Sequence, residues 1–290
     1  MDQSYDPYLD LLKKCLSASI YDESAWKRVD GPMMGNVNKV NLPRYLVALV
    51  KNRVVEGLSK RSLMLVRRRP FDGEIRDQGL DWPLFGYTMI GRRRLDNIQF
   101  CVEDILARNI PGDFIETGVW RGGSAILMRA LLKKHGSKDR SVWCADSFEG
   151  LPKPDEHDRE LDADSDFSDR AYLCATLEDV KKNFARFDLL DDQVKFLKGW
   201  FRDTLPTAPV NQLALLRADG DLYESTRDSL VNLYPKVSQG GYVIVDDYNS
   251  WKGCRSAVDE YRKDHGITDE VRQIDAHAVF WQVSKTIRNS

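Results

Sequence analysis

The fold is decided by two stretches, QLALLRAD at residues 212–219 and GYVIVDD at residues 241–247. Each is an apolar run with the length of a strand, and each ends in aspartate, at Asp219 and at the Asp246-Asp247 pair. Such runs are typical of parallel strands that are buried on both faces. Because the carboxyl ends of these strands meet at one edge of an open α/β sheet, where such sheets hold ligands, we expect the three carboxylates to converge there.

Converging carboxylates need a cation. Like charges at close range raise one another's pKa and cost stability unless a positive charge lies between them. A hard divalent ion with oxygen ligands, such as Mg²⁺, is the simplest answer. The sequence therefore predicts a metal site formed by Asp219, Asp246 and Asp247. The alternative is that these are acidic residues at solvated strand ends, with no ion bound.

From residue 112 onward strands and helices alternate, which is typical of βαβ units on a parallel sheet. The predicted strands are residues 113–116, 141–146, 194–198, 212–219 and 241–247, and the predicted helices are 123–135, 176–187, 225–234 and 253–264. Two alternating runs at the end of the chain, 270–274 and 278–283, predict an antiparallel hairpin. This set predicts a Rossmann-like α/β fold. Five parallel strands followed by an antiparallel hairpin resemble the sheet of class I methyltransferases, which implies seven strands in the order 3-2-1-4-5-7-6.

The chain before residue 112 has a weaker pattern, and we expect residues 1–111 to be a helical extension, on the oligomer or substrate side, of a catalytic domain at residues 112–290. Helix-like stretches cover residues 8–19, 42–58 and 92–108, and basic clusters lie at 60–61 and 67–69. Basic segments of this kind contact an anionic membrane surface or an acidic partner in some proteins. A solvated helix face or a subunit contact is the more ordinary interpretation.

The acidic stretch from residue 152 to residue 170 shows no apolar periodicity. A loop of this length inside a compact domain is usually functional or disordered. We expect it to be a mobile lid.

Length and composition indicate one large domain with an appendage, since 290 residues can bury a sizeable core. A net charge of −2 gives no general reason to expect a nucleic-acid partner. Five cysteines without a Cys-x-x-Cys spacing indicate neither a disulfide framework nor a zinc knuckle, which fits a reducing compartment. The first residues show no signal-peptide pattern and no stretch is apolar enough to span a bilayer, so we expect a cytoplasmic protein.

Two motifs predict a nucleoside cofactor. The segment ETGVWRGG at residues 116–123 joins the first strand to its helix, and its glycines let the backbone approach a ligand closely. It lacks the Gly-x-Gly-x-x-Gly spacing, and with an acid at Glu116 it fits a cationic, amino-acid-bearing cofactor better than a pyrophosphate. Asp146 ends the second strand, where an acidic side chain typically binds ribose hydroxyls. Either motif alone is equally well explained as a tight turn with a helix cap.

Several stretches of the chain are similar to one known family of enzymes. They are residues 87–91, 116–123, 146–152, 189–203, 219–221 and 240–248. In these stretches the chain resembles the macrocin O-methyltransferase family, which methylates sugar hydroxyls on macrolide and aminocoumarin antibiotics. The resemblance extends over roughly residues 88–281.

The resemblance implies a binding site for S-adenosylmethionine. The residues that match this site are Thr88, Met89, Glu116, Thr117, Gly118, Val119, Trp120, Asp146, Ser147, Phe148, Glu149, Gly150, Gly199 and Trp200. It also implies that Asp219, Asp246 and Asp247 are Mg²⁺ ligands. In one branch of the family the residue that matches Asp221 is the proposed general base, and in another branch a lid histidine is favoured. The lid of this chain has only His157, and we expect Asp221 to be the base.

These observations predict a Mg²⁺-dependent S-adenosylmethionine O-methyltransferase that acts on a sugar or another vicinal diol of a small, glycosylated acceptor. The ion would bind two neighbouring hydroxyls and lower the pKa of one, and the lid would exclude water. Two alternatives stay open: a catechol-like phenolic acceptor, and a non-catalytic cofactor-binding scaffold with the basic segment as its partner surface. The resemblance further suggests a homo-oligomer. Residues 31–77 are longer and more basic than is usual in the family, which leaves the acceptor unidentified.

Overall fold

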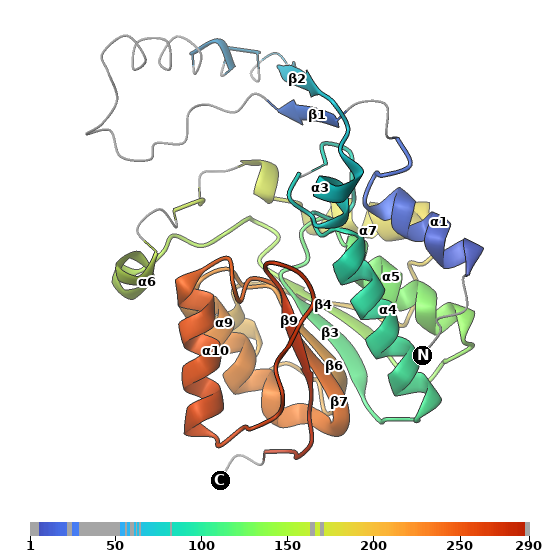
Figure 1. The fold of residues 1–290 in the computed structure, drawn as a ribbon, viewed down its shortest axis with the longest axis vertical. Coiled ribbons are helices and arrows are strands. Elements are labelled where there is room, and N and C mark those ends of the chain that lie inside the picture. The colour runs from blue at the N-terminus through green and yellow to red at the C-terminus, as the bar shows by residue number, and fades with distance from the viewer. Residues whose placement is uncertain are drawn as a thin grey trace.

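A seven-stranded sheet forms the centre of the molecule (Figure 1). The computed structural model describes residues 6–21, 25–28, 53–55, 57–58, 61, 63, 65–81, 83–162, 166–168 and 171–287. The strands of the sheet are Asp113–Thr117 (β3), Val142–Asp146 (β4), Val194–Lys198 (β5), Leu213–Ala218 (β6), Val237–Val245 (β7), Arg272–Gln273 (β8) and Val279–Gln282 (β9). Their order is β5-β4-β3-β6-β7-β9-β8, and only the two pairs that involve β9 are antiparallel. Counted from β3, this order is 3-2-1-4-5-7-6, so the predicted fold is confirmed.

Helices cover both faces of the sheet, as Figure 1 shows for α4 and α5 on one side and α9 and α10 on the other. The first layer comprises Pro7–Leu16 (α1), Arg92–Ala107 (α4), Gly123–Lys134 (α5) and Leu177–Arg186 (α7), and the second comprises Phe201–Thr204 (α8), Tyr223–Leu233 (α9) and Lys252–Asp264 (α10). Successive strand residues point to opposite faces. Phe114 accordingly packs into the first core and Ile115 into the second. Burial on both faces explains why the strands are continuous apolar runs in the sequence.

The last parallel strand, β7, begins four residues earlier than predicted. Val237 pairs with Leu213, and the register then shifts before Leu215 pairs with Tyr242. Gly240 has a φ of 85° and Gly241 follows it, so the glycine pair is a distortion inside the strand rather than its start. A Gly-Gly pair indicates a turn in sequence, which is why the prediction began the strand after it.

The N-terminal part contains a pair of strands in addition to helices of the predicted helical region. Helices α1 and α4 formed at the expected places, and both pack on α5 as part of the first core. The basic cluster at residues 67–69, however, lies in a strand, Val66–Arg69 (β2), which pairs antiparallel with Ala25–Arg28 (β1). Most of the predicted helix at residues 42–58 lies outside the described residues. Within this stretch only residues 53–55 and 57–58 are described, and they are helical. A short helix, Gly73–Asp77 (α3), precedes α4.

The acidic segment that follows β4 contains a short helix, Glu156–Leu161 (α6), which the absence of apolar periodicity did not suggest. The side chain of Asp155 accepts from Asp158 N, and the side chain of Asp158 accepts from Asp155 N. This reciprocal capping box supplies partners for backbone donors that a first helical turn leaves free. Local capping therefore forms α6 without an amphipathic face.

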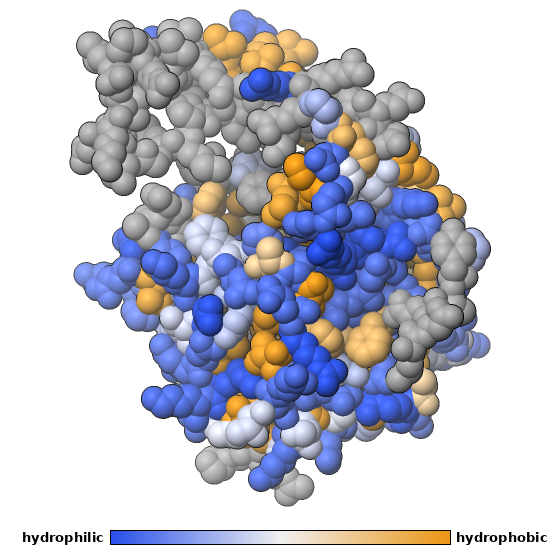
Figure 2. All heavy atoms as spheres, in the orientation of Figure 1, coloured by the Kyte–Doolittle hydropathy of each residue, from blue (hydrophilic) through white to orange (hydrophobic). Residues whose placement is uncertain are grey.

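The molecular surface in the view of Figure 2 is mostly hydrophilic, and the coloured hydrophobic side chains form small separate groups. None of the helices in the described part of the chain is long and apolar enough to cross a membrane.

Candidate active site

The carboxyl ends of β3, β6 and β7 lie side by side, because Asp219 N donates to Thr117 O at 2.9 Å and Asp246 N donates to Ala218 O at 3.0 Å. Just beyond these ends, one carboxylate oxygen from each of Asp219, Asp221 and Asp247 lies within 4.8 Å of the others. Two of the three predicted metal ligands, Asp219 and Asp247, are therefore brought together. The third member of this cluster is Asp221 instead of Asp246.

Asp246 does not join the cluster because two arginines hold its carboxylate. Arg94 Nη1 donates to Asp246 Oδ2 at 2.5 Å, and Arg217 Nη2 donates to Asp246 Oδ1. Arg217 also donates from Nη1 to Glu116 Oε1 at 2.6 Å and to Asp219 Oδ2 at 2.8 Å. One fully buried guanidinium thus joins carboxylates that follow or belong to three strands. Sequence reasoning missed both arginines. Arg217 had a signal, because a charged residue inside an apolar strand run indicates a buried partner; Arg94 is in the run of three arginines that begins α4 and had no such signal.

Of the three carboxylates in the cluster, Asp219 shares Arg217 with two other acids, and Asp221 and Asp247 form no ion pair with a described residue. Burial raises the pKa of Asp219 and Asp221, the latter to about 7, and raises that of Asp247 well above its usual value, with neighbouring carboxylates adding to the effect. Burial acts the same way on Asp246, but Arg217 and Arg94 bring its pKa below the usual value. Asp247 Oδ2 is buried without a hydrogen-bond partner among the described residues. Such a set of oxygens fits a hard divalent cation, which would relieve the repulsion and occupy the unpaired oxygen.

Asp221 lies at a strained position in this cluster. Its φ is 54°, in the left-handed region that non-glycine residues seldom adopt. Trp251 Nε1 donates to Asp221 Oδ1 at 3.1 Å, so the tryptophan that precedes α10 fixes the carboxylate. Strain of this kind persists only where the surroundings enforce it, and it concentrates at functional sites.

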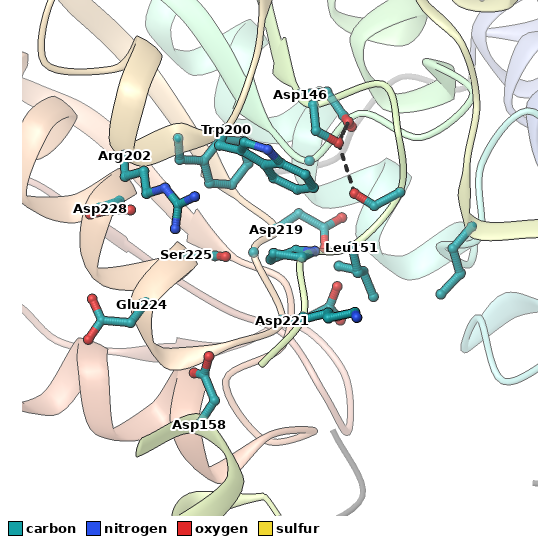
Figure 3. Close-up of a pocket in the computed structure, with 18 of the residues that line it drawn as sticks. Asp146, Leu151, Asp158, Trp200, Arg202, Asp219, Asp221, Glu224, Ser225 and Asp228 are labelled. Carbon is teal, nitrogen blue, oxygen red and sulfur yellow. Dashed lines mark hydrogen bonds between the residues drawn. The ribbon is translucent and has the colours of Figure 1, made fainter. Parts of the chain in front are cut away.

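The loop after β3 is shaped by Asp146 and by close backbone contacts. Val119 N and Trp120 N donate to Asp146 Oδ2 at 2.7 and 3.2 Å, and Phe148 N donates to Oδ1 at 2.7 Å. The dashed line in Figure 3 marks the fourth and longest approach, from Ser147 Oγ at 3.4 Å. These bonds use about four acceptor positions of the carboxylate.

Gly118 in the same loop cannot be replaced by a larger residue. Its φ is 87°, and a Cβ atom there would lie 1.8 Å from the carbonyl oxygen of Asp219. The loop therefore lies directly against the carboxyl end of β6, which brings the glycine segment and the carboxylate cluster to the same place.

Two cavities of about 350 and 380 Å³ meet at this place. The first extends toward Asp146 and Trp200, and the second toward Asp247, Trp251 and His277. Residues that line both are Met89, Gly118, Trp120, Leu151, Leu173, Asp219 and Asp221. In Figure 3 the first cavity has Trp200 and Asp146 toward the top of the view, Asp219 and Asp221 in the middle, and Asp158 below. The site can hold two ligands next to each other.

The predicted cofactor residues divide into two groups. Those that line a cavity are Thr88, Met89, Glu116, Gly118, Val119, Trp120, Asp146, Ser147, Gly150 and Trp200. Those that do not line either cavity are Thr117, Phe148, Glu149 and Gly199. Thr117 and Phe148 are buried, and the Glu149 side chain is 64% exposed. Gly199 N donates to Asp146 O at 2.9 Å, which joins the ends of β4 and β5.

Glu116 is fully buried and still lines the second cavity. Burial raises its pKa to about 7, although Arg217 and Ser124 act in the opposite direction. Glu116 Oε2 has no hydrogen-bond partner among the described residues. A buried carboxylate with an unpaired oxygen is a fitting partner for the ammonium group of an amino-acid-bearing ligand.

Helix α6 of the acidic segment is anchored on the second helical layer. Asp158 Oδ1 accepts from Tyr223 N at 3.0 Å, and the Asp162 carboxylate accepts from Lys252 N and Gly253 N. His157 packs edge-on against the Tyr223 ring and lines neither cavity. The geometry therefore does not place His157 near the carboxylate cluster.

Comparisons with known proteins identify the family of this chain. Residues 5–283 match the macrocin-O-methyltransferase (TylF) family. The chain belongs to the macrocin O-methyltransferase family. It is 51% identical over 238 residues to demethyldecarbamoylnovobiocin O-methyltransferase of Streptomyces niveus, an alignment that covers 82% of this chain and 91% of the relative. It is 48% identical to mycinamicin III 3''-O-methyltransferase of Micromonospora griseorubida, with 76% and 87% covered.

The solved structure of the O-methyltransferase NovP superimposes on this protein with a TM-score of 0.77. The two sequences are 45% identical, and the match covers 96% of this chain and 98% of NovP. The family membership that the sequence motifs suggested is confirmed, and the protein is an S-adenosylmethionine-dependent O-methyltransferase.

Proposed function

We propose that this protein is a Mg²⁺-dependent O-methyltransferase whose acceptor is a sugar of a glycosylated natural product, methylated at one of two neighbouring hydroxyls. The observation that carries the proposal is the carboxylate cluster of Asp219, Asp221 and Asp247 at the wall shared by the two cavities. A cation held there adjoins both ligands. A pair of adjacent hydroxyl oxygens is a natural bidentate ligand for such an ion.

The names of the relatives support the acceptor class. They are enzymes for demethyldecarbamoylnovobiocin, for a tetracenomycin that carries a dimethoxyrhamnosyl group, and for mycinamicin III. The tetracenomycin enzyme, from Streptomyces olivaceus, is 53% identical over 219 residues.

Each ligand has a place in the proposed site. The nucleoside part of S-adenosylmethionine is assigned to the first cavity, beside Asp146 and Trp200. Its amino-acid end is assigned to the adjoining part of the second cavity, where the unpaired Glu116 Oε2 would face the ammonium group. Asp219 and Asp247 are the proposed ion ligands, and Asp246 acts through the two arginines that it binds. When bound, the ion supplies Lewis-acid stabilisation that lowers the pKa of a coordinated hydroxyl.

Asp221 is the proposed proton acceptor. Its carboxylate lies in the cluster and is oriented by the Trp251 indole, so it is fixed near any hydroxyl that the cluster holds. Burial and the carboxylates of Asp219 and Asp246 raise the pKa of Asp221 to about 7 when no ion is bound, and an ion in the cluster would lower it. The base role therefore rests on the position of the carboxylate. Positioning by Trp251 and exclusion of water by the acidic segment are the contributions expected of the remaining protein.

The test is a mass-spectrometric screen for the gain of one methyl group. Purified protein is incubated with S-adenosylmethionine, Mg²⁺ and candidate acceptors that include demethyldecarbamoylnovobiocin, mycinamicin III and a catechol, with a parallel set in excess EDTA. We expect methylation of a glycoside that is lost in EDTA. Methylation of the catechol alone would replace the sugar assignment, and equal turnover in EDTA would remove the metal from the proposal.

A further inference from the structure

We propose that His277 is a specificity-determining residue that binds the acceptor, with its free ring nitrogen hydrogen-bonded to a sugar hydroxyl next to the pair at the carboxylate cluster. This proposal rests on the proposed function, because it assigns a role within the acceptor site. His277 lies in the turn between β8 and β9 and lines the second cavity together with Asp247 and Trp251. It is the only histidine among the residues that line the two cavities.

The imidazole ring is held from one side. His277 Nδ1 and Ser250 Oγ are 2.8 Å apart, and Ser250 belongs to the tight turn after β7. In that turn Ser250 N and Trp251 N donate to Asp247 O at 2.9 and 3.1 Å. The ring therefore keeps a fixed relation to Asp247, a proposed ion ligand only three residues before Ser250.

The backbone of the same turn is held from the other side by a buried carboxylate. Asp275 Oδ1 accepts from His277 N at 2.8 Å and from Ala278 N at 2.9 Å. Asp275 Oδ2 accepts from Arg94 Nε at 2.7 Å, and Arg94 in turn binds Asp246. The Asp275 side chain is 0% exposed and that of Arg94 is 8% exposed. Burying charged groups is costly, so the turn is built to hold one position relative to the strand-end carboxylates.

The second ring nitrogen is left for a ligand. Nε2 of His277 forms no hydrogen bond to any residue that the structure describes. When Ser250 donates to Nδ1, Nε2 carries the proton and donates; in the other tautomer it accepts. A hydroxyl matches either case because it both donates and accepts. A sugar presents such hydroxyls around the ring, whereas a catechol presents only its two adjacent oxygens.

A purely structural role makes a different prediction. If the Ser250–His277 bond only closes the terminal hairpin onto the turn after β7, its loss should lower turnover of all acceptors to the same extent. If His277 binds one hydroxyl, loss of the histidine should lower turnover only for acceptors that carry that hydroxyl. In the wild type an acceptor that lacks this hydroxyl is discriminated against, because it leaves the imidazole nitrogen without a partner.

The experiment compares His277→Ala with wild type on the glycoside that the screen identifies, with demethyldecarbamoylnovobiocin as the first choice, and on its monodeoxy sugar analogues. His265→Ala is the matched control, since His265 stacks on Tyr261 and lines neither cavity. For wild type we expect kcat/KM to fall about tenfold for one deoxy analogue, the scale of one hydrogen bond. His277→Ala should lose that discrimination through a raised KM, with donor affinity within twofold by titration calorimetry.

His277→Gln should restore part of the discrimination, because its amide also donates and accepts. Equal losses for every analogue, or a fall of 100-fold in kcat at unchanged KM, would overturn the proposal in favour of a structural or a proton-transfer role. A wild-type enzyme that methylates no glycoside would instead defeat the proposed function, and this outcome is recognised before any variant is made.

Discussion

Replacing Asp162 with alanine is expected to loosen the acidic segment from α10. The carboxylate accepts from Lys252 N at 3.1 Å and from Gly253 N at 2.7 Å, and these donors lie 90 and 91 residues later in the chain. These amides belong to the first turn of α10, whose N-cap residue, Trp251, provides no side-chain cap. Asp162 therefore serves α10 as an N-cap aspartate would, and its negative charge also favours the positive end of the helix dipole.

The expected size follows from these contacts. Loss of an N-cap side chain costs about 0.5 to 2 kcal/mol. Since one of the two bonds is exposed to solvent, we take about 1 kcal/mol for Asp162→Ala, which corresponds to about a fivefold change in the opening equilibrium.

Hydrogen exchange measured by mass spectrometry on the first turn of α10 reports this equilibrium directly. We expect exchange about fivefold faster in Asp162→Ala than in wild type, at the cap energy given above. Asp162→Asn is the matched control, because asparagine caps helices about as well as aspartate, and it should stay near wild type. The capping argument would be refuted if Asp162→Ala exchanged at the wild-type rate, or if Asp162→Asn exchanged as fast as Asp162→Ala. Exchange of residues 152–162 with and without bound ligands would then test the predicted lid.

Three further outcomes are expected. Asp247→Asn should reduce Mg²⁺-dependent turnover by about tenfold or more, since hard-ion affinity depends on the number of anionic ligands, while calorimetry shows donor affinity within twofold; an unchanged Mg²⁺ requirement would contradict the ligand role. Arg217→Met should lower the free energy of unfolding in urea by about 3 to 5 kcal/mol, because it leaves buried carboxylates uncompensated, and Arg217→Lys should lose less; equal stability would show that the buried charges are otherwise neutralised. Asp221→Asn should reduce kcat by roughly 10²-fold without recovery at higher Mg²⁺, and recovery would identify Asp221 as an ion ligand rather than the base.

The sheet was predictable because each of its main strands carries its own signal. The apolar run at residues 212–219 and the strand ends at Asp146 and Asp219 depend only on local sequence. The pairing of β1 with β2 was not predictable, because strands so far apart in the chain meet through tertiary contacts that neither segment encodes alone. Helix α6 had a signal that was overlooked, the Asp155-x-x-Asp158 spacing of its capping box.

The candidate site was predictable in position but not in detail. Strand-end aspartates had to converge, yet the sequence could not show that Arg94, 152 residues before Asp246, would bind that carboxylate. Nor could spacing place Asp221 in the cluster, because its left-handed backbone directs the side chain in a way that strand alternation does not predict. Side-chain direction after a strand ends depends on turn geometry, and turn geometry depends on what packs beneath it.

The wall that the two cavities share makes this enzyme a suitable target for a single inhibitor that fills both. Met89, Trp120 and Asp221 line both volumes, so with the proposed placement of the two ligands a nucleoside joined to a sugar needs only a short connection. A short linker gives the second half a millimolar effective concentration, and the ordering cost of binding is met once rather than twice. Selectivity within the family would then come from the sugar half alone, because the nucleoside half matches the donor that every member binds.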